Sequence, residues 1–340
     1  MTTPGSELES HPQTSGAAAP ESTKVEQVAG RSPIQLAGAR FRKDKLSMTA
    51  LVIVAVYLVL ALFAPLGAKF GILDPYSFNS SAKFLDIEAG GIPKGFLGGV
   101  SWSHPLGIEP STGRDVLSRL VLGITLSLSI ALSATVVAVG IGTVLGIVSG
   151  FVGGFVDAAV GRLIDLTLSF PQTLMLLALS GLFIAILTEN LGVPPGDLAN
   201  GVYVVLVLGL FGWPPIARVV RGQVLSIRER EFIDAARLMG ASRGRMYFKE
   251  VLPNLWAPLL VYFTLTMPAF ISAEAALSFL GVGIKPPTPT LGNVLADSIN
   301  YSSADFFFFF VPAFLIAAIV VSFNLLGDGL RDALDPRGAR

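Results

Sequence analysis

Residues 120–156 read LVLGITLSLSIALSATVVAVGIGTVLGIVSGFVGGFV and contain no ionisable side chain over 37 consecutive positions. About 20 apolar residues are enough for a helix to cross the hydrocarbon core of a bilayer, whereas a membrane β-strand needs roughly 10. Because backbone amides find no water inside lipid, they must be paired within the segment itself. This stretch therefore predicts an all-α membrane protein.

The composition of the whole chain agrees with this prediction. Charged residues make up 14% of the 340 positions, compared with about 25% in soluble domains. A net charge of zero gives no reason to expect a nucleic-acid partner. The chain has no cysteine and only two histidines, His11 and His104, so we expect no Cys-ligated or His-rich metal site, no cofactor and no catalytic residue.

Five further charge-free runs bring the predicted number of transmembrane helices to six. A single helix over 120–156 would be about 55 Å long, so this run could hold one span or two. We count it once, because counting it twice would export a basic loop that we expect in the cytoplasm. The predicted first span lies in 39–69, after a basic segment, and the other five lie at about 118–150, 160–188, 198–220, 254–283 and 306–327 of a membrane core over 117–330.

Basic residues predict the orientation. Arg40, Arg42, Lys43 and Lys45 precede the first span, which places the N-terminus in the cytoplasm by the positive-inside rule. Six spans return the chain to the same side. We therefore expect a multi-pass protein of the cell membrane, embedded in the lipid bilayer, with both termini cytoplasmic.

The remaining segments lie outside the predicted membrane core. Residues 1–38 are rich in Ser, Pro, Ala and Gly and predict a disordered cytoplasmic tail, and residues 331–340 predict a second cytoplasmic tail. The loop over 70–116 is predicted to be extracytoplasmic. Its aromatic residues could organise a small ordered cap or dock a partner, and the alternative is that they rest at the membrane interface.

The loop over 221–253, RGQVLSIREREFIDAARLMGASRGRMYFKEVLP, is basic and predicts two short helices. Strong helix formers occupy 228–239, and Gly240 suits the left-handed position that ends a helix. Ser242 is a good cap for a second helix, which Pro253 limits. This hairpin either inserts a knob into a groove of another protein or lies on anionic lipid.

We call the two short helices and the corner at Gly240 the knob, and the sequence of this segment resembles that of a known family. Asp234-Ala-Ala, Gly240 and Leu252-Pro253 resemble the EAA loop by which permease subunits of ABC importers engage their ATPases. Four further stretches narrow the resemblance to the C-type permease of dipeptide, oligopeptide and nickel importers. They are LALFAP at 60–65, HPLG at 104–107 with GRDVLSR at 113–119, EAALSFLGVG at 274–283 and NLLGDGLRDALDP at 324–336.

The resemblance covers nearly everything after residue 38, with three departures. Asp234 stands where the family has Glu, Glu250 occupies a position that is usually apolar, and IEPST at 108–112 replaces a shorter link. The first keeps the charge with a shorter side chain. The second puts the local docking geometry in doubt, and the third puts the partner contact of the outer loop in doubt.

The resemblance implies a type I ABC importer permease fold with cytoplasmic EAA coupling helices. It implies a related permease subunit as heterodimer partner, two cytoplasmic ATPase subunits and an extracytoplasmic solute-binding protein that delivers short peptides, although nickel and other solutes share the scaffold. The chain has no Gly-x-x-x-x-Gly-Lys-Ser/Thr loop, so ATP hydrolysis is expected from partners. The implied ATPase-coupling residues are Asp234, Ala235, Ala236, Leu238, Met239, Gly240, Ala241, Ser242 and Pro253.

Inside the membrane, Glu274 and Ser278 are the candidates for the translocation path. A charge in a hydrophobic segment usually faces water or the interior of the bundle. The alternative is a structural hydrogen bond from Glu274 to a neighbouring span. Glu274 also keeps open an ion-coupled secondary transporter, whereas an enzyme is weakly supported because no Gly-x-Ser-x-Gly or His-Glu-x-x-His segment occurs.

Two local patterns predict contacts between or within spans. Gly142, Gly146 and Gly150 have the spacing that lets a neighbouring helix approach closely. Arg162 and Asp165 are three residues apart and predict an ion pair within one helix.

Overall fold

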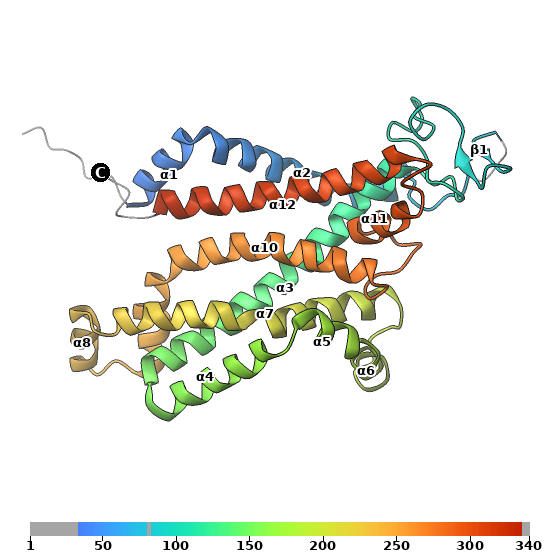
Figure 1. Cartoon of the computed structure of the whole chain (residues 1–340). Helices are drawn as coiled ribbons and strands as arrows, with labels where there is room; N and C mark the ends of the chain where they lie inside the picture. Colours follow the sequence, from blue (N-terminus) through green and yellow to red (C-terminus); the bar gives the residue numbers. More distant parts are fainter. Residues whose placement is uncertain (1–32, 80–82, 335–340) are drawn as a thin grey trace, which may run out of the picture.

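Long apolar helices run side by side along one axis, with a small loop domain at one end and a helical protrusion at the other (Figure 1). The computed structural model describes residues 33–79 and 83–334. The α-helices are α1 Pro33–Lys43, α2 Lys45–Lys69, α3 Val116–Val152, α4 Gly154–Ser169, α5 Gln172–Ala178, α6 Ser180–Ala185, α7 Asp197–Ile227, α8 Glu231–Leu238, α9 Arg243–Arg245, α10 Trp256–Phe279, α11 Leu291–Ile299 and α12 Phe306–Leu334. Two π-helical segments, η1 (Ile186–Asn190) and η2 (Met246–Val251), the 3-10 turn η3 (Leu252–Asn254), and strands β1 (Leu85–Asp86) and β2 (Ile92–Pro93) complete the list.

The number of membrane-crossing helices agrees with the prediction of six. Within the described residues, five helices are long and apolar enough to cross a membrane, and a sixth is counted if the bent pair formed by α5 and α6–η1 is one span. The run 120–156 lies mostly in the single helix α3, as predicted. Helix α7 continues to Ile227 and α12 to Leu334, beyond the predicted ends at 220 and 327, while α10 stops at Phe279, before the predicted 283.

The third hydrophobic run is not the continuous helix that we predicted over 160–188. Helix α4 ends at Ser169, and Phe170 takes an extended backbone with φ −93° and ψ 133°. Pro171 explains this break, because proline disfavours helical backbone at the preceding residue and has no amide hydrogen to donate. Helices α4 and α5 together run along the bundle, and the chain then bends by 52° into α6–η1 (Figure 1).

The prediction of a disordered tail over 1–38 is wrong at 33–38, because these residues are helical and belong to α1. Helix α1 packs against α12, and this contact stabilises a segment that the sequence alone does not mark as helical. Asp44 then starts α2 by accepting hydrogen bonds from the Leu46 and Ser47 amides at 3.0 and 3.3 Å. At the other terminus, α12 includes 331–334 of the predicted tail. Residues 1–32 and 335–340 lie outside the described residues.

The α3–α7 contact confirms the predicted role of the glycines in α3. A Cβ built on Gly142 would lie 2.8 Å from Ile216, and one on Gly146 would lie 2.7 Å from Val220. Gly150 is equally close to the Arg221 carbonyl oxygen. No side chain fits in this contact, so glycine lets the two helices pack along most of their length.

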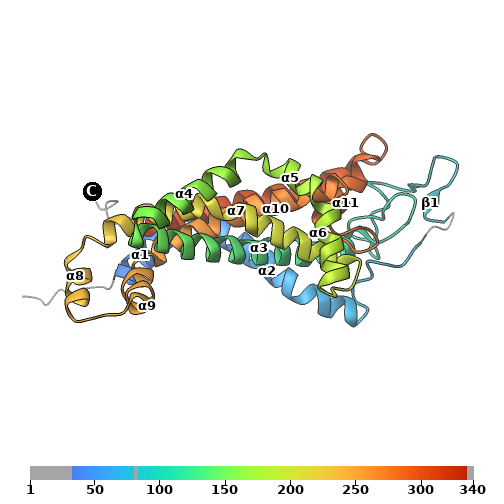
Figure 2. The same ribbon diagram turned by 90° about the horizontal axis from the view of Figure 1, so that it is seen from below.

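The described part of the predicted extracytoplasmic loop contains two short strands. Strands β1 and β2 pair antiparallel, with Leu85 opposite Pro93 and Asp86 opposite Ile92. We call the described part of 70–115 the cap. Figure 2 shows the cap and α11 at one end of the bundle, with α8 and α9 at the opposite end.

Candidate functional site

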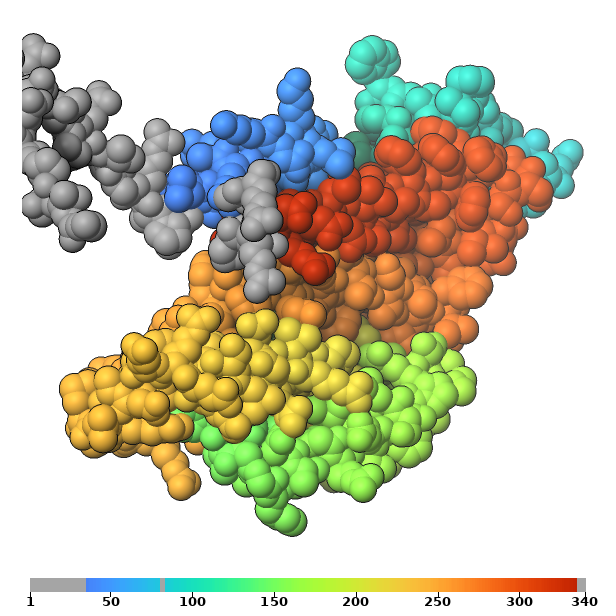
Figure 3. Space-filling model, turned by 60° about the vertical axis from the view of Figure 1, so that its left-hand side comes forward, coloured from blue at the N-terminus to red at the C-terminus, as the bar shows by residue number. Residues whose placement is uncertain are grey.

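Helices α8 and α9 and the corner between them form the predicted knob, which protrudes from one end of the bundle (Figure 3, yellow to orange). Helix α8 begins at Glu231 rather than at the predicted 228, because α7 continues to Ile227 and Arg230 is extended. Glu231 and Asp234 lie in the first turn, where negative charge favours the helix dipole. Helix α8 is therefore a separate short helix, which a three-residue turn joins to the long helix α7.

The corner has the hydrogen bonds of a Schellman motif. The Gly240 amide donates to the Arg237 carbonyl at 2.9 Å, and the Ala241 amide donates to the Ala236 carbonyl at 3.0 Å. Gly240 has φ 75°, the left-handed backbone that its position predicted. Ser242 then caps α9 by accepting from the Arg245 amide at 3.4 Å. Both local predictions, the glycine end and the serine cap, are confirmed.

The inner face of the knob is anchored to the bundle. Ile233 and Ala236 are buried in the same apolar cluster as Met246 and Val251 of η2. The Arg237 guanidinium lies 5.4 Å from the centre of the Phe151 ring at the end of α3. These contacts fix the position of α8 relative to α3.

The tip of the knob is apolar and exposed. Leu238 is 91% exposed and Met239 is 75% exposed, and both lie at the tip. Asp234 pairs with Arg237 of the same helix at 3.2 Å, an exposed pair that contributes little stability. Two large apolar side chains at the tip of a protrusion indicate a surface that a partner covers.

Pro253 lies in η3, behind the knob, where the chain turns into α10. The predicted coupling residues 234–242 thus share one protrusion, and Pro253 shapes its return to the membrane. Their contact with an ATPase stays a prediction.

A polar clamp holds the bundle together next to the knob. Arg221 of α7 donates two hydrogen bonds to Asp157 of α4, at 2.5 and 2.6 Å, and Ser149 of α3 donates to the same carboxylate at 2.5 Å. Nearby, Asp165 pairs with Arg218 of α7 at 2.6 Å. The predicted partner of Asp165 was Arg162, so this prediction is wrong: the partner comes from the neighbouring helix.

Glu274 and Ser278, the candidates for the translocation path, lie on α10 and bond to each other. Glu274 is 2% exposed, and its two carboxylate oxygens accept from Ser127 of α3 at 2.8 Å and from Ser278 at 2.9 Å. Ser127 in turn accepts from the Leu291 amide at the start of α11 at 3.1 Å. This arrangement joins three helices, which is the interhelical hydrogen bonding that we gave as the alternative. A role in the path stays a prediction.

A cavity of about 480 Å³ on the α3–α7 side of the bundle was not predicted. Its lining is mostly apolar, and it includes Ser129 and Ser133 of α3 and Thr288. Two serines four residues apart lie on one face of a helix, so the spacing was readable in the sequence. The spacing did not show which face of α3 lines a cavity.

A buried ion cluster at the cap was also missed. Glu109 accepts from the Arg114 Nε at 2.5 Å and lies 3.7 Å from the Arg119 Nε, and all three side chains are almost fully buried. The departure at 108–112 supplies Glu109, and the family-like stretch 113–119 supplies both arginines. Asp297 of α11 is close by, and burial, reinforced by the Glu109 charge, raises the pKa of its carboxyl.

Two protein families match the chain. The family described as "Binding-protein-dependent transport system inner membrane component" matches residues 142–340, and "N-terminal TM domain of oligopeptide transport permease C" matches residues 32–84. The first match includes the knob and Glu274. The second includes α1 and α2.

Three relatives with curated names are similar to the chain. A dipeptide transport system permease protein of Alkalihalophilus pseudofirmus is 34% identical over 306 residues, which is 90% of each chain. A glutathione transport system permease protein of Escherichia coli is 33% identical over 311 residues, covering 90% of this chain and 91% of the relative. An oligopeptide transport system permease protein of Mycobacterium tuberculosis is 44% identical over 172 residues, covering 51% and 58%.

A solved structure supports the fold. A chain of the MetNI methionine ABC transporter, in an inward-facing conformation, superimposes with a TM-score of 0.50 at 20% identity. The match covers 65% of this chain and 96% of that one. The α-helical permease architecture predicted from the sequence is confirmed.

Proposed function

This protein belongs to the family of inner membrane components of binding-protein-dependent transport systems, as a permease subunit of an ABC importer, and we propose that its cargo is short peptides. The observation that carries the proposal is the similarity over 90% of the chain to a dipeptide permease. A permease named for glutathione, itself a short peptide, matches over the same share of the chain.

We propose that the knob lies in the cytoplasm with both termini. The described start of α1, the knob and the described end of α12 lie at one end of the bundle (Figures 1 and 2). That end carries Arg40, Arg42 and Lys43 of α1 and the basic residues around α9. The positive-inside rule then assigns this end to the cytoplasm and the cap to the outside.

The knob supports an ATPase as the partner on the cytoplasmic side. The sequence has no phosphate-binding loop, so hydrolysis is assigned to separate subunits. The apolar tip, Leu238 and Met239, would enter a groove of one ATPase, while Ile233 and Arg237 tie the knob to the bundle. When ATP binding brings the ATPases together, the knobs move with them.

The movement shifts the bundle between inward-open and outward-open states. A partner shifts such an equilibrium only by contacts that differ between the two states. The anchoring contacts around Phe151 connect the knob to α3, and α3 packs against α7 along its length. A paralogous permease would supply the second half of the pathway, and a solute-binding protein would deliver the peptide to the cap side.

Uptake of a labelled dipeptide into proteoliposomes tests the proposal. With the partner permease, both ATPases and the binding protein present, uptake should require ATP. Gly240→Pro should leave the subunit in the membrane and abolish uptake, because proline cannot adopt φ 75°. Uptake driven by an ion gradient without ATPases would contradict the proposal, and uptake of nickel instead of peptide would contradict the cargo assignment.

A further inference from the structure

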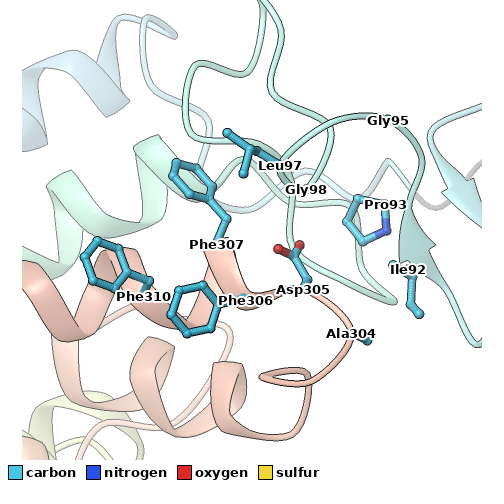
Figure 4. A pocket seen from close by; sticks show the side chains of 10 residues that line it. All are labelled: Ile92, Pro93, Gly95, Leu97, Gly98, Ala304, Asp305, Phe306, Phe307 and Phe310. Carbon is cyan, nitrogen blue, oxygen red and sulfur yellow. The ribbon is translucent and has the colours of Figure 1, made fainter.

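A pocket of about 590 Å³ lies where the start of α12 meets the cap (Figure 4). Asp305 lies between the phenylalanines of α12, Phe306 and Phe307, and the cap residues Gly98 and Pro93, and Leu97 of the cap lies beside Phe307. The pocket is thus formed by two segments that are about 200 residues apart in the sequence. It is separate from the knob and from the cavity beside α3 and α7.

Asp305 is a buried acid with half of its hydrogen-bonding capacity unused. Asp305 is 6% exposed. Its Oδ1 accepts a hydrogen bond from the Phe308 amide at 3.1 Å, and this bond caps α12. Oδ2 has no hydrogen-bond partner among the described residues. A buried carboxylate oxygen without a donor costs free energy, so a donor at this position would stabilise the structure.

Gly98 of the cap approaches Oδ2 closely. A Cβ built on Gly98 would lie 2.5 Å from this oxygen, and Gly98 has φ 73°. Gly95 and Gly99 beside it also have positive φ. Any side chain at position 98 would fill the space beside this oxygen, and glycine leaves that space open.

The aromatic residues continue from the pocket along the outside of α12. Phe306 is 64% exposed and Phe310 is 47% exposed, and their rings stack with centres 5.8 Å apart. Phe310 stacks in the same way on Phe314, also at 5.8 Å. This row enters the part of α12 that is apolar enough to cross a membrane. An acid at the top and an apolar row below it suit a ligand with a cationic head and a hydrocarbon chain.

We propose that this pocket binds the primary ammonium group of a phospholipid with an ethanolamine headgroup. The ammonium donates a hydrogen bond to Oδ2 of Asp305, and the phenylalanine rings add cation–π attraction. An acyl chain then follows Phe306, Phe310 and Phe314. A trimethylammonium headgroup has the same charge but no hydrogen to donate, so the site discriminates against choline lipids.

Native mass spectrometry of the assembled importer tests this site. The complex is exchanged into detergent with equal amounts of ethanolamine and choline lipids that have identical acyl chains. We expect retention of the ethanolamine lipid over the choline lipid by about tenfold, the effect of one charge-assisted hydrogen bond. Asp305→Asn keeps an oxygen for the Phe308 amide and should remove this preference.

Glu88→Gln is the matched control, because Glu88 is exposed in the turn between β1 and β2 and its loss of charge should leave the preference unchanged. Thermal unfolding of each variant verifies that it is folded. Equal retention of the two lipids by the unmodified protein, or an unchanged preference in Asp305→Asn, would overturn the proposal. Displacement of the lipid by a dipeptide with a free N-terminus, and not by its acetylated form, would assign the ammonium to the peptide and overturn the lipid assignment.

Discussion

The knob and the cap differ in whether contacts within the chain cover their side chains. The knob has complete backbone hydrogen bonding at its corner and presents Leu238 and Met239 to its surroundings. The cap region contains a buried ion cluster, in which Glu109 lies beside Arg114 and Arg119. The knob is therefore a stable local structure with an exposed apolar tip, whereas this part of the cap is stabilised by contacts within the chain.

Substitutions at the tip of the knob should have the largest effect on transport. We expect Leu238→Asp combined with Met239→Asp to lower ATP-driven peptide uptake at least about tenfold, because each charge would be buried in the partner's groove. The subunit should still insert, since both side chains are exposed in the isolated chain. Uptake in proteoliposomes and the amount of ATPase that co-purifies are the measurements.

Leu191→Asp is the control for this prediction. Leu191 is also exposed and directly follows η1. Helix α6, which continues into η1, lies at the end of the bundle opposite the knob (Figure 2). Normal co-purification of the ATPases with the knob variant would show that the tip is not the contact.

Removal of the buried acid of the cap should mainly affect stability. Glu109→Ala leaves Arg114 and Arg119 buried without their carboxylate, and breaking a buried pair in this way costs about 3 kcal/mol. Thermal unfolding of the purified subunit measures the loss. Control substitution of Glu88, which is exposed, should be neutral, and an unchanged unfolding temperature for Glu109→Ala would show that the ion cluster does not stabilise the cap.

The α3–α7 contact connects the two ends, and a larger residue there should be costly. We expect Gly146→Leu to destabilise the subunit by about 2 kcal/mol, because its Cβ would lie 2.7 Å from Val220. Gly140→Leu is a matched control on the same helix, since a Cβ at this position meets nothing within 4 Å. Equal unfolding temperatures for the two variants would contradict the close packing of α3 and α7.

The smallest effect is expected at Asp297, where its size depends on pH. Burial raises the pKa of this carboxyl in the folded state, so the folded protein holds the proton more tightly than the unfolded chain. Stability contributed by the protonated form is lost as pH rises from the unfolded pKa through the folded one. Asp297→Asn should therefore unfold about 2 °C higher at pH 7 than the unmodified protein. The gain should shrink towards pH 4, and a gain that is constant with pH would contradict this.

The features that the sequence predicted correctly depend on residues close together in the chain. The charge-free runs predicted the helices, and the spacing of Gly240 and Ser242 predicted the corner of the knob. Each of these signals lies within a few residues of the structure that it determines, or within one apolar run. The resemblance of the same segments to importer permeases predicted the family.

The features that were missed depend on residues far apart in the chain. Asp165 pairs with Arg218 rather than with its neighbour in sequence, and Asp305 meets Gly98 of the cap. The break at Pro171 was readable, but proline also occurs inside α2, α7, α10 and α12 without ending them. Packing against other helices decides whether a helix ends at a proline or continues through it. The sequence of one helix does not contain this packing.

The central claim is that the knob contacts the ATPase, and a single cysteine tests it most directly. The chain has no native cysteine, so Met239→Cys provides one thiol at the tip of the knob. A thiol-specific cross-linker added to the assembled importer should join this subunit to an ATPase subunit, while Leu191→Cys should not. Cross-linking of Met239→Cys to the solute-binding protein, or no ATPase adduct in complexes that transport peptide, would contradict the account.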